Sequence, residues 1–165
     1  MATLTDSADG HTLEIVLLDE GPRHPVNPDM DFWWLNLKVT VRTTARSWDS
    51  SGEILTAGEL FRLADQVMAW SELPAAEDEW MFTEPNLTVR KRASSGARTH
   101  LEFGFDYETH PDHPREAGDP HWVVFDVEPS ALTRFGSDLM ESIKNLIPGI
   151  ARVPNRRKKT DGADR

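Results

Sequence analysis

Hydrophobic and polar residues alternate strictly along residues 32–43, where leucine and valine occupy every second position after the aromatic start. This period of two is typical of a β-strand with one buried and one solvent-facing side. One-sided burial favours antiparallel pairing, because parallel sheets are usually covered on both faces. We therefore expect residues 32–43 to be the central strand of a mostly antiparallel sheet of five or six strands. Similar alternation marks the segments from which its other strands are drawn, at residues 12–18, 46–55, 80–83, 87–92, 98–108 and 121–127, of which 80–83 is short.

Two further segments carry hydrophobic residues at helical spacing. The first begins at Thr56, because residues 56–59 match a capping box in which Thr56 and Glu59 satisfy each other's backbone N–H groups. The second begins at Pro129, since proline is favoured at the first helical position, and it ends at residues 148–149. Each helix has one apolar stripe, so we predict an α+β fold with both helices packed on one face of the sheet.

The length of 165 residues is that of one domain, which we place at residues 1–150. Residues 151–165 are charged and lack apolar periodicity, so they are expected to form a disordered basic tail. The whole chain carries a net charge of −10, although the tail holds six basic and two acidic residues. An acidic body repels nucleic acid and attracts basic partners, while excess negative charge also simply keeps a protein soluble.

Several classes of chemistry are excluded or unsupported by the sequence. The chain has no cysteine, which excludes disulfides, thiolate zinc sites and a cysteine nucleophile. Glycine-rich phosphate loops, a Gly-x-Ser-x-Gly elbow and a His-Glu-x-x-His helix are missing from it. It also has no secretory signal and no apolar run of the ~18 residues that a membrane span needs. We expect a cytoplasmic protein without a cofactor.

The strongest candidate for metal chemistry is a group of histidines in and after the loop at residues 109–120. A metal site needs three or four ligands that converge on one point, and loop histidines beside prolines do not ensure this. The sequence leaves open two interpretations, a solvated loop and a small metal-dependent hydrolase centred on His110, His113 and His121.

Six tryptophans and a group of carboxylates suggest a binding surface. Trp34 and Trp122 fall on the polar side of their strands, and exposed tryptophan beside charge is enriched at protein interfaces. Alternatively, the tryptophans cover a sheet edge or lie under the proline-rich loop at residues 19–31, and the acids are only solvated. The acids on the same predicted sheet face are Glu102, Asp106, Glu108 and Asp126.

Four sequence patterns occur in a characteristic order along residues 12–147. They are Asp-Phe-Trp-Trp-Leu-Asn-Leu-Lys-Val-Thr-Val-Arg from Asp31, Thr-Ala-Gly-Glu-Leu from Thr56, Glu-Pro-Asn-Leu-Thr-Val from Glu84 and Val-Val-Phe-Asp-Val-Glu from Val123. In these patterns the chain resembles the WapI-type immunity proteins of bacterial polymorphic toxin systems.

The resemblance implies an intracellular protein that binds and neutralises a cognate toxin domain through a complementary surface, without an active site. An acidic protein suits this role because nuclease toxins are commonly basic. No binding residues of the family transfer position by position. The interface candidates are therefore those of this sequence, namely Trp34, Trp122, Glu102, Asp106, Glu108 and Asp126. An interaction module without a toxin partner is a further alternative.

Overall fold

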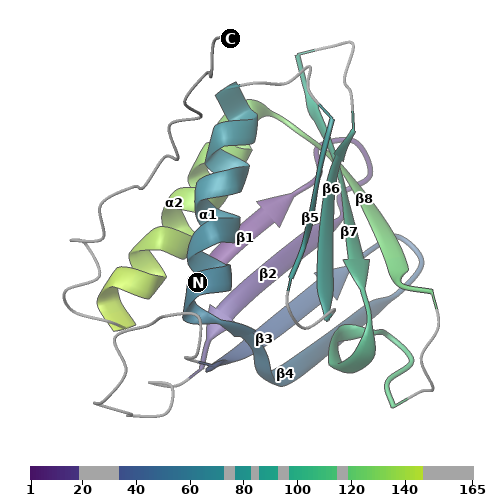
Figure 1. Ribbon diagram of the computed structural model, residues 1–165. Helices are drawn as coiled ribbons and strands as arrows, with labels where there is room; N and C mark the ends of the chain where they lie inside the picture. Colours follow the sequence, from purple (N-terminus) through teal and green to yellow (C-terminus); the bar gives the residue numbers. More distant parts are fainter. Residues whose placement is uncertain (19–33, 73–76, 83–85, 93–96, 115–118, 147–165) are drawn as a thin grey trace, which may run out of the picture.

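The computed structural model describes residues 1–18, 34–72, 77–82, 86–92, 97–114 and 119–146. Within these ranges the chain forms two four-stranded antiparallel sheets, in each of which every strand pairs with the next along the chain (Figure 1). Sheet A consists of β1 (Ala2–Thr5), β2 (Thr12–Leu17), β3 (Trp34–Arg42) and β4 (Ser47–Thr56). Sheet B consists of β5 (Asp78–Met81), β6 (Leu87–Arg92), β7 (Thr99–Phe105) and β8 (His121–Val127). The helices are α1 (Ala57–Glu72), α2 (Pro129–Leu146) and the 3₁₀ turn η2 (Tyr107–Thr109).

The predicted α+β class and antiparallel pairing are confirmed, but the described strands form two sheets of four instead of one sheet of five or six. Alternation along the chain indicates where strands lie but not which strands pair. It therefore did not reveal that β4 and β5, which α1 separates in the sequence, belong to different sheets. The additional strand, β1, is short and precedes a turn with two aspartates, so its pattern is too weak to recognise. The predicted basic tail and the proline-rich loop at residues 19–31 lie outside the described residues.

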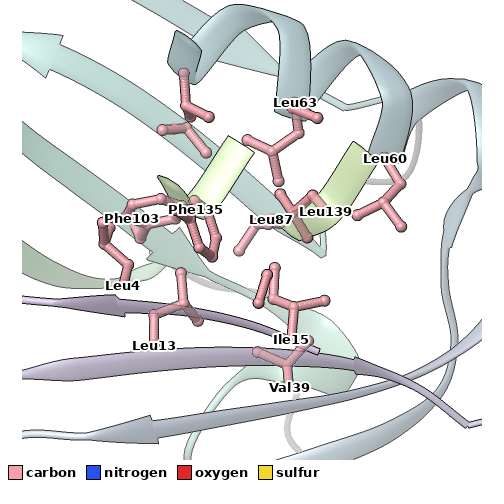
Figure 2. Packing of buried hydrophobic residues seen from close by; sticks show 14 of the residues in the cluster. Leu4, Leu13, Ile15, Val39, Leu60, Leu63, Leu87, Phe103, Phe135 and Leu139 are labelled. Carbon is pink, nitrogen blue, oxygen red and sulfur yellow. The ribbon is translucent and has the colours of Figure 1, made fainter. Parts of the chain in front are cut away.

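Both sheets and both helices share one hydrophobic core (Figure 2). The helices lie side by side, and α2 also packs against β1. Their apolar stripes meet side chains from the inner faces of both sheets, as helices with a single apolar face require. The residues labelled in Figure 2, all buried, are Leu4, Leu13, Ile15, Val39, Leu60, Leu63, Leu87, Phe103, Phe135 and Leu139.

An irregularity in β4 changes its course just before α1. The sequence predicts a bulge or bend at residues 50–52. In the structure, Leu35 pairs with Leu55 and Asn36 with Glu53, so Ile54 is the extra residue on β4. Gly52 has a φ of 150°, a conformation that glycine tolerates and other residues rarely adopt. The irregularity thus lies just beyond the predicted position, and it precedes the buried end of the strand.

The predicted capping box at the start of α1 is confirmed. The backbone N–H of Thr56 donates to Glu59 Oε2 at 2.9 Å, and the backbone N–H of Glu59 donates to Thr56 Oγ1 at 3.2 Å. Thr56 Oγ1 also lies 3.1 Å from Glu59 Oε2. Both side chains are buried, so water cannot replace these bonds without opening the corner between β4 and α1.

We therefore expect Glu59→Ala to lower the free energy of unfolding by about 1–2 kcal/mol. Urea denaturation measures this change, with Asp65→Ala as the control because Asp65 is exposed on the same helix. Equal stability of the two variants would contradict a capping role for Glu59.

Candidate functional site

Three of the predicted interface residues lie on the outer face of sheet B, the side turned away from the core. In the β7–β8 ladder, Gly104 stands opposite Trp122, Val124 opposite Glu102 and Asp126 opposite His100. The Trp122 ring lies across Gly104, where an added Cβ would come within 2.8 Å of the indole. Glycine at this position lets the tryptophan lie flat on the sheet, half-buried.

An arginine from β6, two strands away in the sheet, holds Trp122 in place. The guanidinium carbon of Arg90, on β6, lies 4.0 Å from the centre of the Trp122 ring. Arg90 Nε is also 3.1 Å from Glu79 Oε2 on β5. This cation–π contact and ion pair connect β5, β6 and β8 across the outer face, and a cation–π contact at such a site contributes about 0.5–1 kcal/mol.

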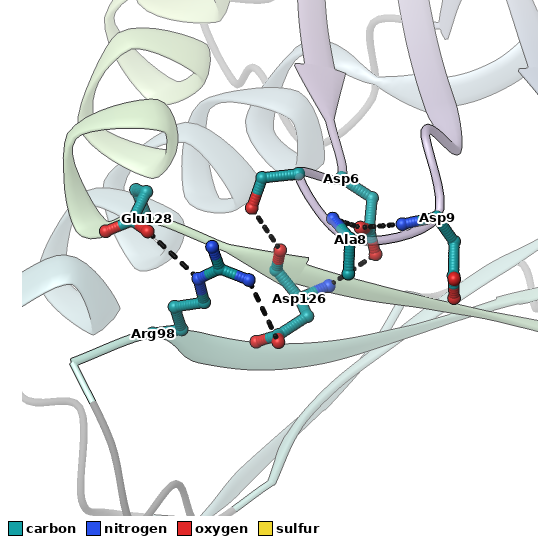
Figure 3. A network of polar contacts seen from close by, with 7 residues as sticks. Asp6, Ala8, Asp9, Arg98, Asp126 and Glu128 are labelled. Carbon is teal, nitrogen blue, oxygen red and sulfur yellow. Dashed lines mark hydrogen bonds and ion pairs between the residues drawn. The ribbon is translucent and has the colours of Figure 1, made fainter.

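The two predicted interface carboxylates on this face, Glu102 and Asp126, each have an arginine partner. Arg92 Nη2 lies 2.8 Å from Glu102 Oε2, and its hydrogen bond to Glu102 raises the pKa of Arg92. Arg98 Nη1 lies 3.7 Å from Asp126 Oδ2, and its Nε lies 2.9 Å from Glu128 Oε1 (Figure 3). The outer face of sheet B is therefore a surface of paired charges around one tryptophan.

The other predicted residues lie elsewhere. Trp34 begins β3 in sheet A, opposite Thr56, and is half-buried. The strand predicted at residues 98–108 ends at Phe105, so Asp106 and Glu108 are not on a sheet face. Asp106 is buried, and its carboxylate accepts the backbone N–H of Tyr107 at 2.9 Å as the cap of η2. Glu108 is exposed on η2.

The turn that contains η2 faces β4 and leaves a cleft of about 270 Å³ between them. Trp48 of β4 forms one side of the cleft. Its indole N–H donates to the carbonyl oxygen of Thr109 at 2.9 Å, which fixes the position of the ring. Its ring also meets Phe105 and His121 edge-on, with centroids 5.4 and 5.3 Å apart. The cleft is lined by Trp48, Asp49, Ser50, Ser51, Glu108, His110, Pro111 and His113.

The His110 side chain stabilises the turn. His110 Nδ1 accepts the backbone N–H of Asp112 at 3.0 Å, which makes this nitrogen an acceptor. Arg46 donates to Asp112 Oδ1 at 2.9 Å, and this hydrogen bond lowers the pKa of the Asp112 carboxyl group. The His110 and His121 rings are 6.0 Å apart, and burial, followed by the positive charge of Arg46, lowers the pKa of His121.

The geometry does not assemble the metal site that the sequence left open. Among the described residues, the ligand atoms of His110, His113 and His121 do not form a set of three within 4.8 Å of one another. The described group that meets this distance is Asp6, Asp9 and His11, in the turn between β1 and β2.

That turn has a structural role, which Figure 3 shows. The Asp6 carboxylate accepts the backbone N–H groups of Ala8, Asp9 and Asp126, the last at 2.7 Å. His11 Nδ1 lies 3.0 Å from the carbonyl oxygen of Val124. These bonds fasten the turn of sheet A to β8, the edge strand of sheet B, and cover backbone groups that an edge would otherwise leave exposed.

Sequence reasoning missed the part of the cleft that β4 supplies. Trp48 and Asp49 lie about sixty positions before the histidines, and no local pattern links the two segments. The one available signal was a tryptophan beside an acidic residue on a strand, which does not distinguish these positions from others in the chain.

These features describe an α+β protein in which sheet B has a polar outer face and a polar cleft lies between β4 and η2. None of its described helices is long and apolar enough to cross a membrane. The chain matches the model of the immunity protein WapI-like family over residues 3–146, and it belongs to this family. The resemblance noted in the sequence is thereby confirmed over both sheets and both helices. No curated protein matches the chain.

Proposed function

We propose that this protein is an immunity protein that binds and neutralises a cognate bacterial toxin domain without catalysing a reaction. The observation that carries the proposal is the family match over residues 3–146, which runs from β1 to the end of α2. Neutralisation by binding needs complementary shape and charge rather than reacting groups, and the extended sheet faces offer such a surface.

The charge of the chain supports a basic partner. The net charge is −10, and because the tail from Arg152 is basic, the remaining residues carry more negative charge still. Such a field speeds association with a basic protein and disfavours nucleic acid or an anionic membrane. We place the encounter in the cytoplasm, and no cofactor is needed for it.

The outer face of sheet B is the contact surface that we propose for the toxin domain. Trp122 offers a flat aromatic anchor whose position is held by Arg90, and tryptophan and arginine are enriched among residues that dominate binding energy. On the same face, Val124 lies between Trp122 and Asp126 along β8 and opposite Glu102, and it is 39% exposed. Asp106 acts indirectly by holding Glu108, and Trp34 is the candidate on the other sheet.

Co-purification from the native host with the full chain as bait, followed by mass spectrometry, tests the function. The expected result is a stoichiometric toxin-domain partner, and metal analysis of the same sample should find no bound metal. Bound metal without a protein partner would overturn the proposal in favour of the histidine-based enzyme. Loss of protection confined to variants that unfold would also contradict it.

The contact surface makes its own prediction. Trp122→Ala should weaken binding to the co-purified toxin domain by about 2 kcal/mol or more, which titration calorimetry can measure. Trp34→Ala is the comparison variant, because it removes the other half-buried tryptophan among the interface candidates, from sheet A. If Trp34→Ala weakens binding and Trp122→Ala does not, the interface lies on the other sheet. Thermal unfolding of both variants distinguishes lost contacts from lost folding.

A further inference from the structure

β4 is the last strand of sheet A, and one of its two edges has no partner strand. Near the end of the strand, Asn86 Nδ2 donates to the carbonyl oxygen of Ile54 at 3.4 Å. Along residues 47–53, the backbone hydrogen bonds seen in the described ranges run to β3 alone. We call this open side of residues 47–53 the β4 edge. Such an edge presents a row of unpaired N–H and C=O groups that can pair with another chain.

The register of the β3–β4 ladder shows which backbone groups face outward. The N–H of Thr43 donates to the carbonyl oxygen of Arg46 at 2.8 Å, which makes these two residues the hydrogen-bonded pair at the turn. Bonded and non-bonded pairs alternate from there along an antiparallel ladder. The carbonyl oxygen of Asn36, opposite Glu53, accepts the N–H of Leu18 on the other side, as this alternation requires. The residues whose N–H and C=O groups point away from β3 are therefore Ser47, Asp49, Ser51 and Glu53.

The other strands at the ends of the two sheets have short or covered edges. β1 has four residues, and α2 packs against it, with the Met1 amino group 3.0 Å from Ser142 Oγ. The edge of β8 is covered by the β1–β2 turn, where Asp6 accepts the N–H of Asp126. β5 has four residues and begins with two acidic ones. Short length, charge and covering elements are the usual protections against edge pairing, whereas β4 has ten residues and leaves its edge open.

The cleft of about 270 Å³ adjoins the β4 edge. Its lining includes four successive residues of β4, from Trp48 to Ser51. Successive side chains of a strand point to opposite faces, so a cleft lined by all four runs along the edge rather than over one face. This space leaves room beside the edge for the side chains of an added strand. The residues on the opposite side of the cleft are Glu108, His110, Pro111 and His113.

The charge of β4 distinguishes between possible occupants of its edge. β4 contains Asp49 and Glu53 and no lysine or arginine. Asp49 Oδ2 lies 3.5 Å from Lys38 Nζ, whereas Glu53 stands opposite the uncharged Asn36. Pairing with β4 of a second copy would gather the acids of both copies on one sheet face and join two chains of net charge −10. A strand with basic side chains meets opposite charge instead, so the edge favours a basic segment.

We propose that the β4 edge binds an extended basic segment of the toxin domain, which pairs with residues 47–53 as a fifth strand of sheet A. In strand addition, main-chain hydrogen bonds give affinity and alternate side chains give specificity. The toxin as the source of the strand rests on the proposed immunity function, but strand addition at this edge does not. The rings of Trp48 and His121 have centroids 5.3 Å apart, and His121 precedes Trp122 in β8. One toxin domain can therefore contact both this edge and the outer face of sheet B.

Amide hydrogen exchange of the full chain, followed by NMR, tests strand addition directly. In the free protein the N–H groups of Trp48, Ser50 and Gly52 should exchange slowly, because they are bonded to β3. Those of Asp49 and Ser51 should exchange fast. The probe is the basic peptide acetyl-Thr-Lys-Val-Lys-Val-Lys-Thr-amide. At saturation we expect exchange at Asp49 and Ser51 to slow by about tenfold or more, with little change at Trp48 and Ser50.

A matched pair of variants separates the backbone from the side chain. Ser51→Pro removes one outward N–H without removing a bond to β3, and edge strands tolerate proline. It should weaken binding of the peptide by about tenfold or more, whereas Ser51→Ala keeps the N–H and should change binding by about twofold or less. Thermal unfolding checks that Ser51→Pro folds. Two peptide analogues, with glutamate in place of lysine or proline in place of valine, should not bind the natural chain.

Absence of slowing with the basic peptide, or equal slowing with the glutamate analogue, would overturn the proposal. Slow exchange at Asp49 and Ser51 in the free protein would also overturn it. If this protection rose with protein concentration, the occupant would be a second copy, and if it did not, the edge would be covered within the chain.

The same measurement on the complex with the captured toxin domain tests the occupant. Unchanged exchange along residues 47–53 in that complex would reject strand addition by the toxin and leave the immunity function intact. Peptide binding without any captured toxin domain would reject the immunity function and leave the β4 edge as a site for basic extended segments.

Discussion

Replacing Gly136 by alanine should destabilise the protein by about 1–3 kcal/mol, although helix propensity alone predicts a gain of about 1 kcal/mol. Gly136 is buried in α2 where this helix crosses α1. A Cβ at this position would lie 2.7 Å from the carbonyl oxygen of Ala64 and 2.5 Å from Met68 Cγ. The Met68 side chain can move, but the Ala64 carbonyl belongs to the α1 backbone, so the helices would have to separate.

Separation of the helices would disturb the core on both sides of the contact. Four buried apolar residues lie within a few positions of this contact in the sequence. They are Leu63 and Val67 of α1 and Phe135 and Leu139 of α2. Because protein interiors are packed at crystal-like density, even a small displacement loses contacts along both apolar stripes. The steric cost should therefore exceed the backbone entropy that alanine saves.

Urea denaturation of Gly136→Ala measures the net effect. Arg134→Ala is the control, because Arg134 is exposed on the same helix and arginine and alanine have similar helix propensities. The control should change stability little. A stable or stabilised Gly136→Ala protein would show that the two helices can separate at little cost.

Replacing Asp6 by alanine should lower the free energy of unfolding by about 3 kcal/mol. Its buried carboxylate accepts three backbone N–H groups, two in the β1–β2 turn and one from Asp126 on β8 (Figure 3). Alanine would leave these donors without their acceptor and detach the turn of sheet A from the edge of sheet B. The turn donors can regain water, but the bond to β8 has no evident substitute.

The same carboxylate should make the free energy of unfolding depend on pH in the acidic range. Burial raises the pKa of Asp6. The backbone N–H groups of Asp126, Asp9 and Ala8 and the charge of His11 together lower this pKa by more than burial raises it, so the net shift is downward. A lowered pKa in the folded state stabilises the protein fully above the unfolded-state pKa of about 3.9. This contribution is lost as the pH falls through the lower, folded-state value.

Urea midpoints of the natural protein and of Asp6→Asn, measured from neutral pH down to strongly acidic pH, test this dependence. The difference in stability between them should be largest above pH ~4 and should shrink below it. Asp9→Asn is the control, because Asp9 is exposed in the same turn. A difference that stays constant with pH would show that Asp6 acts without its charge.

Local patterns predicted the elements well. The strands at residues 87–92 and 121–127 have the predicted bounds, and the capping box places the start of α1 to within one residue. Strand alternation and helix caps depend on neighbours within a few positions, so they are visible in a single sequence. The α+β class follows from the same patterns, because one-sided strands need helices or another sheet to cover them.

Lys91 shows where pattern and residue type disagree. The alternation along β6 turns Thr88, Arg90 and Arg92 outward, which leaves Lys91 on the inner side, and it is only 1% exposed. Burial lowers its pKa, opposed by the negative charge of Asp78 on the neighbouring strand. Residue type alone predicts an exposed lysine, but the register of the strand overrides that preference because pairing fixes every side chain together.

The sequence by itself determined every described strand except β1, both helices, the cap of α1 and the family of this protein, because each depends on short-range patterns. Only the tertiary structure decided that the strands form two sheets and that Asp126 of β8 is paired with Arg98. It also created the cleft, by bringing β4 beside η2. These features depend on contacts between distant segments, which packing of the shared core selects and local periodicity does not encode.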